Sequence, residues 1–410
     1  MKTADLRVAL FSGNYNYIKD GANQALNRLV AGLESQGAAV RIYSPTSSTP
    51  AFEPAGTLIS VPSISIPRRR EYRLALGMPG HIRDDIIQFS PNIFHVSAPD
   101  LLGYQALTLA EKMLVPAVAS VHTRFETYLR YYHLGLFENL LKSYFRHFYH
   151  RCVQIYAPSE SMAEALRDEH MAKDIQIWGR GVDSSLYAPA RRDMAWRRSL
   201  GIADTDIVIA FVGRLVLEKG LGVFCKVIKR LEHLGITHKV LIIGDGPERK
   251  WFEASLPQAI FTGFLTGEKL ARAFASSDIF FNPSQTETFG NVTLEAMASG
   301  LPTVGLQATG SSSLIIHDKT GFLCAADDLE DMTTTLARLV QNADLRDRFG
   351  KAARAISLGQ SWDQILFTLF QNYITVVANT TRARQDTAPT APDFVSDIPF
   401  SSSRRPAKHG

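Results

Sequence analysis

Residues 275–305 have the sequence ASSDIFFNPSQTETFGNVTLEAMASGLPTVG, which contains the pattern of a strand, a helix and a second strand. The first strand is predicted at 278–284, and the helix that follows ends at Gly300. The second strand is predicted at 301–306. Two strands joined by a helix form the unit from which parallel sheets are built. The stretch therefore predicts a parallel sheet covered by helices.

The same alternation extends to both sides and forms two blocks, with helices such as 21–37 and 218–235 between the strands. In the first block the predicted strands are LRVALFS (6–12), AAVRIYS (38–44), NIFHVSA (92–98), AVASVHT (117–123) and VQIYAPS (153–159). In the second block they are DIVIAFVG (206–213), HKVLIIG (238–244), AIFTG (259–263), DIFFNPS (278–284) and LPTVGL (301–306). Near-continuous apolar strands are typical of parallel sheets buried on both faces. The sequence predicts an α/β fold of two Rossmann-like, doubly wound parallel-sheet domains that face each other across a cleft.

The polar and basic stretch 183–204 separates the two blocks. We predict an N-terminal domain over 1–183 and a C-terminal domain over 184–360. Residues 361–378 form an amphipathic pattern long enough to pack back on the N-terminal domain as a helix. Residues 379–410 are poor in apolar side chains and rich in Pro, Ser and Thr, which predicts a disordered tail.

Composition excludes several classes of protein. The 45% hydrophobic and 20% charged content is that of a globular chain, not of a collagen, a coiled coil or a disordered protein. The net charge of +4 is too small to indicate nucleic-acid binding. Cys152, Cys225 and Cys324 are widely spaced, which argues against a disulfide framework or a zinc site. With neither a secretory leader nor an apolar run of membrane-spanning length, the sequence predicts a cytoplasmic protein.

Ligands of open α/β sheets bind beyond the carboxyl ends of the strands, so the residues that follow each strand are the candidate site. Arg214 and Lys219 follow the strand at 206–213, at a spacing that can direct both cations at one anion. Arginine offers a fixed fork of donors and lysine a mobile point charge, a combination that suits a diphosphate. An isolated R-x4-K is usually a pair of surface charges, but here Gly213 and the EKG that opens a helix form an arranged turn.

Glu287 and Glu295 lie eight residues apart, the first in a loop and the second about one turn into the next helix. The backbone N–H groups of Phe289, Gly290 and Asn291 lie near the helix start and can bind an anion or a sugar oxygen. Carboxylates accept hydrogen bonds from pairs of hydroxyls, so ribose and hexose are natural ligands. The simpler alternative is that Glu295 caps or pairs locally.

The other strand ends supply further candidates. Gly13 and Gly21 flank the loop after the first strand, Gly246 lies in the GDGP turn at 244–247, and the pair Gly263 and Phe264 follows another strand. His122 ends the strand at 117–123, although a lone histidine is often only a packed residue.

The chain lacks two common nucleotide-binding motifs, and its one D-x-D motif is predicted away from the site. The first strand is followed by no G-x-G-x-x-G, and the chain has no P-loop, which argues against NAD and P-loop nucleotide sites. Asp204 and Asp206 form a D-x-D, but they precede their strand and should lie at the end opposite the site. We therefore predict no bound metal and no cofactor, so cationic side chains would stabilise the diphosphate alone.

Together with GRLVLEKG (213–220) and GDGP, the stretch 275–305 closely resembles the retaining, nucleotide-sugar-dependent glycosyltransferases of family 4, which have the GT-B fold. The resemblance extends to about residue 378. SVHTRFETYLRYYHL (120–134) and WGRGVDSSLYAP (178–189) are similar to the subgroup of GDP-mannose-dependent α-mannosyltransferases and sulfoquinovosyl-diacylglycerol synthases.

The resemblance implies a role for each site residue. Arg214 and Lys219 would bind the donor diphosphate, Glu295 the ribose, and Glu287 with the Phe289–Asn291 backbone the sugar hydroxyls. His122 would lie beside the donor sugar, and Gly263 with Phe264 would border the base. The family often has a Gly-Gly pair where this chain has Gly21-Ala22, and Gly13-Asn14 can serve instead.

These roles imply transfer of a hexosyl group with retention, by attack of an acceptor hydroxyl on the same face from which the phosphate departs. GDP-mannose is the first expectation for the donor, and a UDP-hexose or UDP-uronate is the alternative. The expected acceptor is a membrane lipid or a lipid-linked glycan. A soluble acceptor or a growing polysaccharide is the alternative, and a nucleotide-sugar epimerase or a non-catalytic nucleotide-sugar sensor are more remote ones.

Two basic segments suggest peripheral contact with an anionic membrane. Arg68, Arg69, Arg70 and Arg73 follow the stretch VPSISIP, and Lys142, Arg146 and Arg151 lie among aromatic residues in 137–152. Cations close to a surface of anionic lipid add about 1 kcal/mol each. An ordinary helix with one solvated face explains the second segment equally well.

Overall fold

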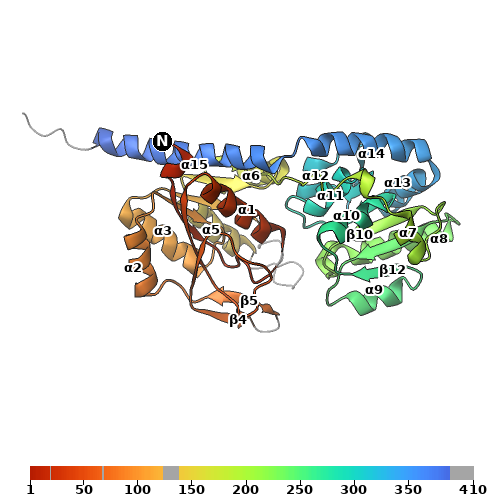
Figure 1. Cartoon of the computed structure of the whole chain (residues 1–410), viewed down its shortest axis with the longest axis horizontal. Coiled ribbons are helices and arrows are strands. Elements are labelled where there is room, and N and C mark those ends of the chain that lie inside the picture. Colours follow the sequence, from red (N-terminus) through yellow and green to blue (C-terminus); the bar gives the residue numbers. More distant parts are fainter. Residues whose placement is uncertain (19, 67–68, 123–137, 388–410) are drawn as a thin grey trace, which may run out of the picture.

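The computed structural model describes residues 1–18, 20–66, 69–122 and 138–387, which form two lobes joined end to end (Figure 1). The first lobe contains a seven-stranded sheet with the strand order β3-β2-β1-β6-β7-β8-β9, and every neighbouring pair is parallel. Its strands are β1 (Arg7–Phe11), β2 (Ala39–Ser44), β3 (Thr57–Ser60), β6 (Ile93–Val96), β7 (Ala117–Ser120), β8 (Gln154–Ala157) and β9 (Ile175–Ile177).

The second lobe contains a six-stranded parallel sheet in the order β12-β11-β10-β13-β14-β15. Its strands are β10 (Val208–Val212), β11 (Lys239–Ile243), β12 (Ile260–Gly263), β13 (Ile279–Asn282), β14 (Thr303–Leu306) and β15 (Gly321–Cys324). The strand order reverses between β1 and β6 in the first sheet and between β10 and β13 in the second, and such points are where open sheets bind ligands. The two doubly wound parallel sheets predicted from the sequence are confirmed.

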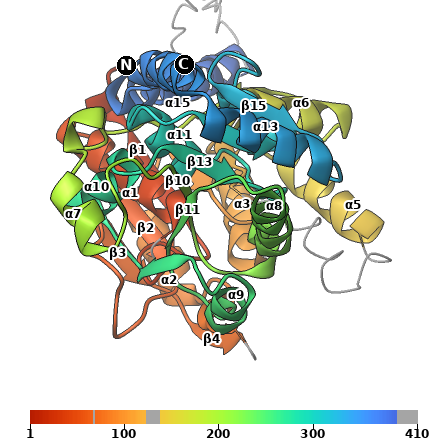
Figure 2. The ribbon, with the colours of Figure 1, turned by 90° about the vertical axis from the view of Figure 1, so that its right-hand side faces the viewer.

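Helices connect the strands in both lobes, as Figure 2 shows along the long axis of the molecule. The first lobe contains α1 (Gly21–Ser35), α2 (Gly80–Phe89), α3 (Leu101–Met113), α5 (Glu138–Tyr149) and α6 (Glu160–Asp168). The second contains α7 (Met194–Ser199), α8 (Leu221–His233), α9 (Arg249–Ser255), α10 (Gly267–Ala275), α11 (Asn291–Ala298), α12 (Thr309–Leu314), α13 (Leu329–Gln341) and α14 (Ala343–Leu358). None of the helices in the described ranges has the length and apolar content needed to span a bilayer.

All ten strands predicted from apolar runs are present, and the strands that the prediction missed lie at sheet edges or outside the two main sheets. They are β3, β9, β15 and the antiparallel hairpin of β4 (Ser63–Ile66) and β5 (Arg69–Ala75). Edge strands bury less of their surface, so they need no continuous apolar run, and β3 has no fully buried residue. The three cysteines are free and buried.

The last helix, α15 (Trp362–Thr387), runs back along the first lobe, parallel to the long axis of the molecule (Figure 1). Leu366, Leu369, Phe370, Tyr373 and Val377 enter the hydrophobic core that β1 and α1 also line. A side chain of this size stabilises the fold by about 1.5–3 kcal/mol when it is fully buried. The helix therefore belongs structurally to the lobe that begins the chain.

The structure corrects the expected disorder of residues 379–387, because α15 continues through them to Thr387. The hydroxyls of Thr380 and Thr381 donate to the carbonyl oxygens of Val376 and Val377 within the helix. A polar surface is compatible with a helix that has already started on a buried face. Residues 388–410, also predicted as tail, lie outside the described residues.

Candidate active site

The two lobes meet at Thr288, in the loop between β13 and α11. The Thr288 hydroxyl donates to the His122 carbonyl oxygen just beyond β7, over 2.9 Å. The Ser159 hydroxyl, just beyond β8, donates to the Thr288 carbonyl oxygen over 2.9 Å. The hydroxyls of Ser161 and Ser313 lie 2.7 Å apart and join α6 to α12. The carboxyl ends of the first sheet therefore contact the loop that contains Glu287 and Phe289.

Two of the predicted diphosphate and sugar ligands lie together at this interface. Lys219 Nζ and Glu287 Oε1 are 2.5 Å apart, and both side chains are half-buried or more. Arg214 lies at the end of β10, the strand that precedes Lys219, and it is exposed. The ion pair brings together the cation predicted to bind phosphate and the carboxylate predicted to bind sugar hydroxyls.

The helices that follow β10 and β13 both start at a glycine with a left-handed backbone. Gly220 (φ 75°) precedes α8 and Gly290 (φ 95°) precedes α11, and neither helix has a side-chain cap. In contrast, α1, α3 and α6 are capped by Asp20, Asp100 and Ser159. Capping side chains satisfy the first N–H groups of a helix. The first N–H groups of α8 and α11 therefore have no capping side chain as acceptor, as is also the case in α2, α9, α10 and α12.

The start of α1 approaches the start of α11 from the opposite lobe. A Cβ atom on Gly21 would lie 2.1 Å from Asn291 Nδ2, so only glycine fits there without a movement of Asn291. A Cβ atom on Gly13 would instead lie 3.1 Å from Asp100 Oδ2, within the first lobe. Of the two predicted glycines, Gly21 is therefore the one that approaches the donor loop.

The other predicted glycines form a close-packed row at the ends of β10, β11 and β12. The Gly213 N–H donates to the Ile243 carbonyl oxygen, and the Gly244 N–H donates to the Gly263 carbonyl oxygen. A Cβ atom on Gly246 would lie 2.4 Å from the Leu215 carbonyl oxygen. Phe264 extends from this row and is 66% exposed, which leaves an aromatic face accessible for a base.

Glu295 lies in a separate, more enclosed position. Its carboxylate accepts a hydrogen bond from the Tyr187 hydroxyl, which lowers the pKa, and Arg28 of α1 lowers it further. Burial outweighs both effects and raises the pKa of Glu295 to about 7. Arg28 also stacks 4.9 Å from the centre of the Trp362 ring, at the start of α15. Glu295, the carboxylate predicted to bind the ribose, therefore gains or loses its proton near neutral pH.

His122 lies at the interface, but its ring is turned into the first lobe. Nε2 is 2.8 Å from Ser120 Oγ, and Arg180 Nη2 donates to Nδ1 over 3.0 Å. Burial, then Arg180, keeps the pKa of His122 well below its ordinary value, so the ring is neutral. The atom that His122 presents to the second lobe is its carbonyl oxygen, the acceptor of Thr288.

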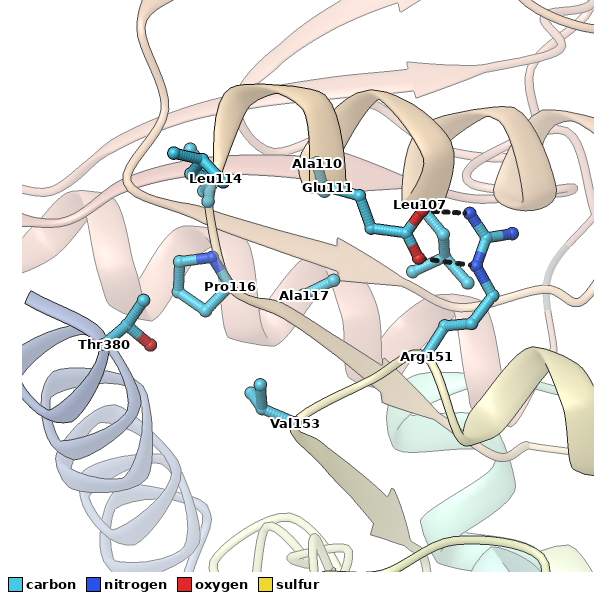
Figure 3. A pocket seen from close by; sticks show the side chains of 10 residues that line it. Leu107, Ala110, Glu111, Leu114, Pro116, Ala117, Arg151, Val153 and Thr380 are labelled. Atoms are coloured by element: carbon cyan, nitrogen blue, oxygen red, sulfur yellow. Dashed lines mark hydrogen bonds and ion pairs between the residues drawn. The ribbon is translucent and has the colours of Figure 1, made fainter. Parts of the chain in front are cut away.

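Two other features lie away from this interface. Asp204 is paired with Arg198 and precedes β10, at the end of the strand opposite Arg214. A hollow of about 200 Å³ lies at the amino ends of β7 and β8 beside Thr380 of α15, with the Glu111–Arg151 ion pair on its wall (Figure 3). No predicted site residue lines that hollow.

Sequence reasoning missed the residues that join the lobes and those that hold His122. Ser159 and Thr288 gave no signal, because small hydroxyl side chains are common in loops. Arg180 had one: it is a cation within the otherwise apolar stretch WGRG (178–181), and it is 4% exposed. A buried arginine needs acceptors, and Arg180 donates to the carbonyl oxygens of Trp178 and Gly179 and to His122.

Two family models match this chain, one for each lobe. The model "Glycosyltransferase Family 4" matches residues 19–186, and "Glycosyl transferases group 1" matches residues 193–356. The chain is 32% identical to the GDP-mannose-dependent alpha-mannosyltransferase of Mycolicibacterium smegmatis, over 91% of this chain and 98% of that protein. The chain belongs to glycosyltransferase family 4.

Other similarities support the same assignment. The chain is 33% identical to the sulfoquinovosyl transferase SQD2 of Arabidopsis thaliana, over 87% of this chain and 71% of that protein. The structure resembles that of sucrose-phosphate synthase from Thermosynechococcus elongatus, with a TM-score of 0.76, 17% identity, and coverage of 91% of this chain and 99% of the other. The fold is GT-B, and the protein is a glycosyltransferase that acts on nucleotide sugars.

We expect Gly21→Ala to lower kcat/KM for the donor by about tenfold or more, because its methyl group would displace the Asn291 amide at the lobe interface. In an Asn291→Ala background the same change should cost clearly less, since the atom it meets is gone. Steady-state kinetics of the four proteins measure this coupling. Gly80→Ala at the start of α2, where a Cβ would meet only Arg83 Nη2 at 3.8 Å, is the matched control. Equal effects of Gly21→Ala in both backgrounds would contradict the steric explanation.

We expect Glu295→Gln to become more stable relative to the wild type as pH rises from 5 to 8, by about 2 kcal/mol. In the wild type the folded carboxyl has a raised pKa of about 7, so ionising it above its unfolded pKa opposes folding, and the amide removes this cost. Urea unfolding of both proteins at pH 5, 6, 7 and 8 measures the difference. A difference independent of pH would show that Glu295 is not perturbed by burial.

Proposed function

We propose that this protein is a retaining glycosyltransferase that moves a hexosyl group from GDP-mannose to a hydroxyl of a membrane lipid or a lipid-linked acceptor, forming an α-glycoside. The observation that supports the donor site is the meeting of Lys219, Glu287 and the uncapped starts of α8 and α11 at the lobe interface. The name of the Mycolicibacterium smegmatis relative supports GDP-mannose.

The charges at the interface fit a nucleotide diphosphate. Lys219 and Arg214 supply positive charge, and the starts of α8 and α11 add uncapped N–H groups. The start of α1 also approaches Asn291, but its first N–H groups are capped by Asp20. The cations and the uncapped N–H groups are fixed before the reaction, so they can stabilise charge on the departing diphosphate without rearrangement. We therefore propose that transfer needs no divalent metal.

The proposed reaction is attack by an acceptor hydroxyl on the anomeric carbon, on the face from which the phosphate leaves. The sugar–phosphate bond breaks, its electrons pass to the phosphate oxygen, and that oxygen takes the proton of the acceptor hydroxyl. Two contacts support a mechanism without an enzymic base. Glu287 is paired with Lys219, and both ring nitrogens of His122 are already hydrogen-bonded within the first lobe.

The roles proposed for the remaining residues follow their positions. Glu287 and the backbone of Phe289–Asn291 hold the sugar hydroxyls, and Glu295 binds the ribose. Phe264 borders the base, beside the glycine row. A UDP-hexose or a UDP-uronate is the alternative donor, which the similarity to a sulfoquinovosyl transferase supports.

For the lipid acceptor, we propose that the β4–β5 hairpin contacts the membrane. Ile64 and Leu74 are directly opposite each other in the hairpin and are 51% and 46% exposed. Exposed apolar side chains beside cations are typical of surfaces that bind the lipid interface. Arg73 precedes Leu74 in the strand, so its side chain points to the other face of the hairpin, where it donates to the Ser63 hydroxyl. The side chains of Arg68, Arg69 and Arg70 lie outside the described residues.

The structure gives the basic residues of 137–152 a different role. Lys142 is paired with Glu138 and Glu169, Arg146 donates to the Glu169 carbonyl oxygen, and Arg151 is paired with Glu111. These cations hold α5 against its own lobe, so the proposed membrane contact does not depend on them.

We expect the wild-type protein to release nucleotide and form a new lipid band from GDP-mannose and extracted lipids, in the presence of EDTA. Arg214→Ala and Lys219→Ala should each slow transfer by about 10²-fold or more, about 3 kcal/mol, because each removes a donor to the leaving diphosphate. Arg198→Ala is the matched control, because that arginine is paired with Asp204 at the other end of β10.

Parallel assays with UDP-sugars and with soluble glycans test the alternative substrates. Product formed from UDP-sugars but not from GDP-mannose would show that the donor is a UDP-sugar. Near-wild-type turnover in both the Arg214 and the Lys219 variants would refute the diphosphate site, and complete loss of activity in EDTA, restored by magnesium, would refute metal independence.

We expect the protein to float with vesicles that contain anionic phosphatidylglycerol, and added salt should weaken this binding. The double change Ile64→Glu and Leu74→Glu should abolish most of it, because two apolar contacts become acidic. Leu234→Glu, at a 63% exposed leucine of the second lobe, is the control. Flotation unaffected by the double change would place the membrane contact elsewhere, and no flotation of the wild type would refute it.

A further inference from the structure

A row of buried hydrogen bonds joins His122 to the last helix of the chain. Arg180 Nη2 lies 3.0 Å from His122 Nδ1, and His122 Nε2 lies 2.8 Å from Ser120 Oγ. Ser120 Oγ lies 2.8 Å from His95 Nε2, and His95 Nδ1 is bonded to the Tyr373 hydroxyl oxygen of α15. The row crosses the first sheet from β9 through β7 and β6 to the helix.

Arg180 fixes the direction of the first two bonds in this row. A guanidinium group has only donors, so His122 Nδ1 must be an unprotonated acceptor. The neutral His122 ring then has its proton on Nε2 and donates it to Ser120 Oγ. A row that continues in one direction uses the single Ser120 proton for His95 Nε2 and puts the His95 proton on Nδ1, directed at Tyr373. In such a row the two histidines are opposite tautomers.

The inner part of the row is buried, whereas His122 at its end is partly exposed. Ser120 is 2% exposed, and both His95 and Tyr373 are 0% exposed. Trp178 packs edge-on against both imidazole rings, with centroids 5.8 Å from His95 and 5.6 Å from His122. A buried polar group that loses its partner costs about 1–3 kcal/mol, so each member of the row holds the next in place.

The end of this row is the contact between the two lobes. With both ring nitrogens occupied, His122 offers its carbonyl oxygen to the Thr288 hydroxyl, next to Glu287. The ring contacts anchor the His122 side chain in the first lobe and so restrain the position of its Cα atom, from which the carbonyl group that binds Thr288 extends.

We propose that Tyr373 is a positioning residue for the reaction: it accepts from His95 Nδ1, which directs the Ser120 hydroxyl at His95 and helps to keep the neutral His122 ring, whose tautomer Arg180 sets, in place beside the carbonyl oxygen that binds Thr288. This inference rests on the proposed function, because it treats the loop from Glu287 to Asn291 as the donor site. In this proposal α15, the helix that contains Tyr373, influences where that loop lies.

The wild-type protein, labelled with ¹⁵N-histidine and recorded at pH 7, gives a direct test by NMR. Ring-nitrogen shifts distinguish the two neutral tautomers, and His95→Gln and His122→Asn identify the signals. We expect His122 protonated on Nε2 and His95 protonated on Nδ1. The same tautomer for both rings, or a charged form of either, would overturn the proposal.

Tyr373→Phe removes only the hydroxyl that ends the row. We expect it to disturb the ring signals of both histidines and to lower kcat by about tenfold, with a smaller change in KM for the donor. The matched control is Tyr156→Phe, because that hydroxyl is equally buried, donates to Gln154, and belongs to a ring 5.9 Å from Tyr373. The control should leave both histidine signals and kcat nearly unchanged.

Two outcomes of this comparison would overturn the proposal. One is an unchanged His122 signal in Tyr373→Phe, and the other is an equal fall of kcat in the two variants, which would indicate a merely structural effect. If the wild type transfers no sugar from any nucleotide, the proposed function fails. The NMR spectra of the wild type and of the two variants would still test the row of hydrogen bonds, because they do not depend on transfer activity.

Discussion

The contact of Thr288 with the first lobe is the interaction on which the geometry of the site depends. Its hydroxyl donates to one segment beyond the first sheet, and its carbonyl oxygen accepts from another. Glu287 and Phe289 are its neighbours in the chain, so these two bonds set where the loop after β13 lies relative to the opposite lobe. Without them, Lys219 and Glu287 would still be paired, but the loop that contains Glu287 would lose its own hydrogen bonds to the first lobe.

The candidate site contains several positively charged groups and two carboxylates whose surroundings differ. Glu287 is half-buried and paired with a lysine, whereas Glu295 is enclosed beside a tyrosine and has a raised pKa. The positive field comes from Lys219, from Arg214 and from the starts of helices that lack capping side chains. A ligand with a diphosphate at one end and hydroxyls at the other matches this distribution of charge.

The fold was predictable where burial imposes a pattern, and much of the site was predictable because its residues follow strands. Central strands such as β10 and β13 are continuous apolar runs, whereas the edge strand β9 is only three residues long and has a glutamine at its centre. Lys219 and Glu287 could be placed together, since neighbouring parallel strands end at one edge. Contacts between lobes, such as Gly21 with Asn291, could not, because no local pattern encodes the distance between two domains. The end of α15 was missed because its last residues resemble a polar tail.

The chain passes between the lobes twice, and the two passages lie side by side. The Val182 N–H donates to the Gln360 carbonyl oxygen, and a Cβ atom on Gly181 would lie 2.5 Å from the Trp362 backbone nitrogen. The two segments are therefore tied to each other at the point where the lobes join. Any change in the angle between the lobes has to pass through both crossings of the chain at the level of Gly181.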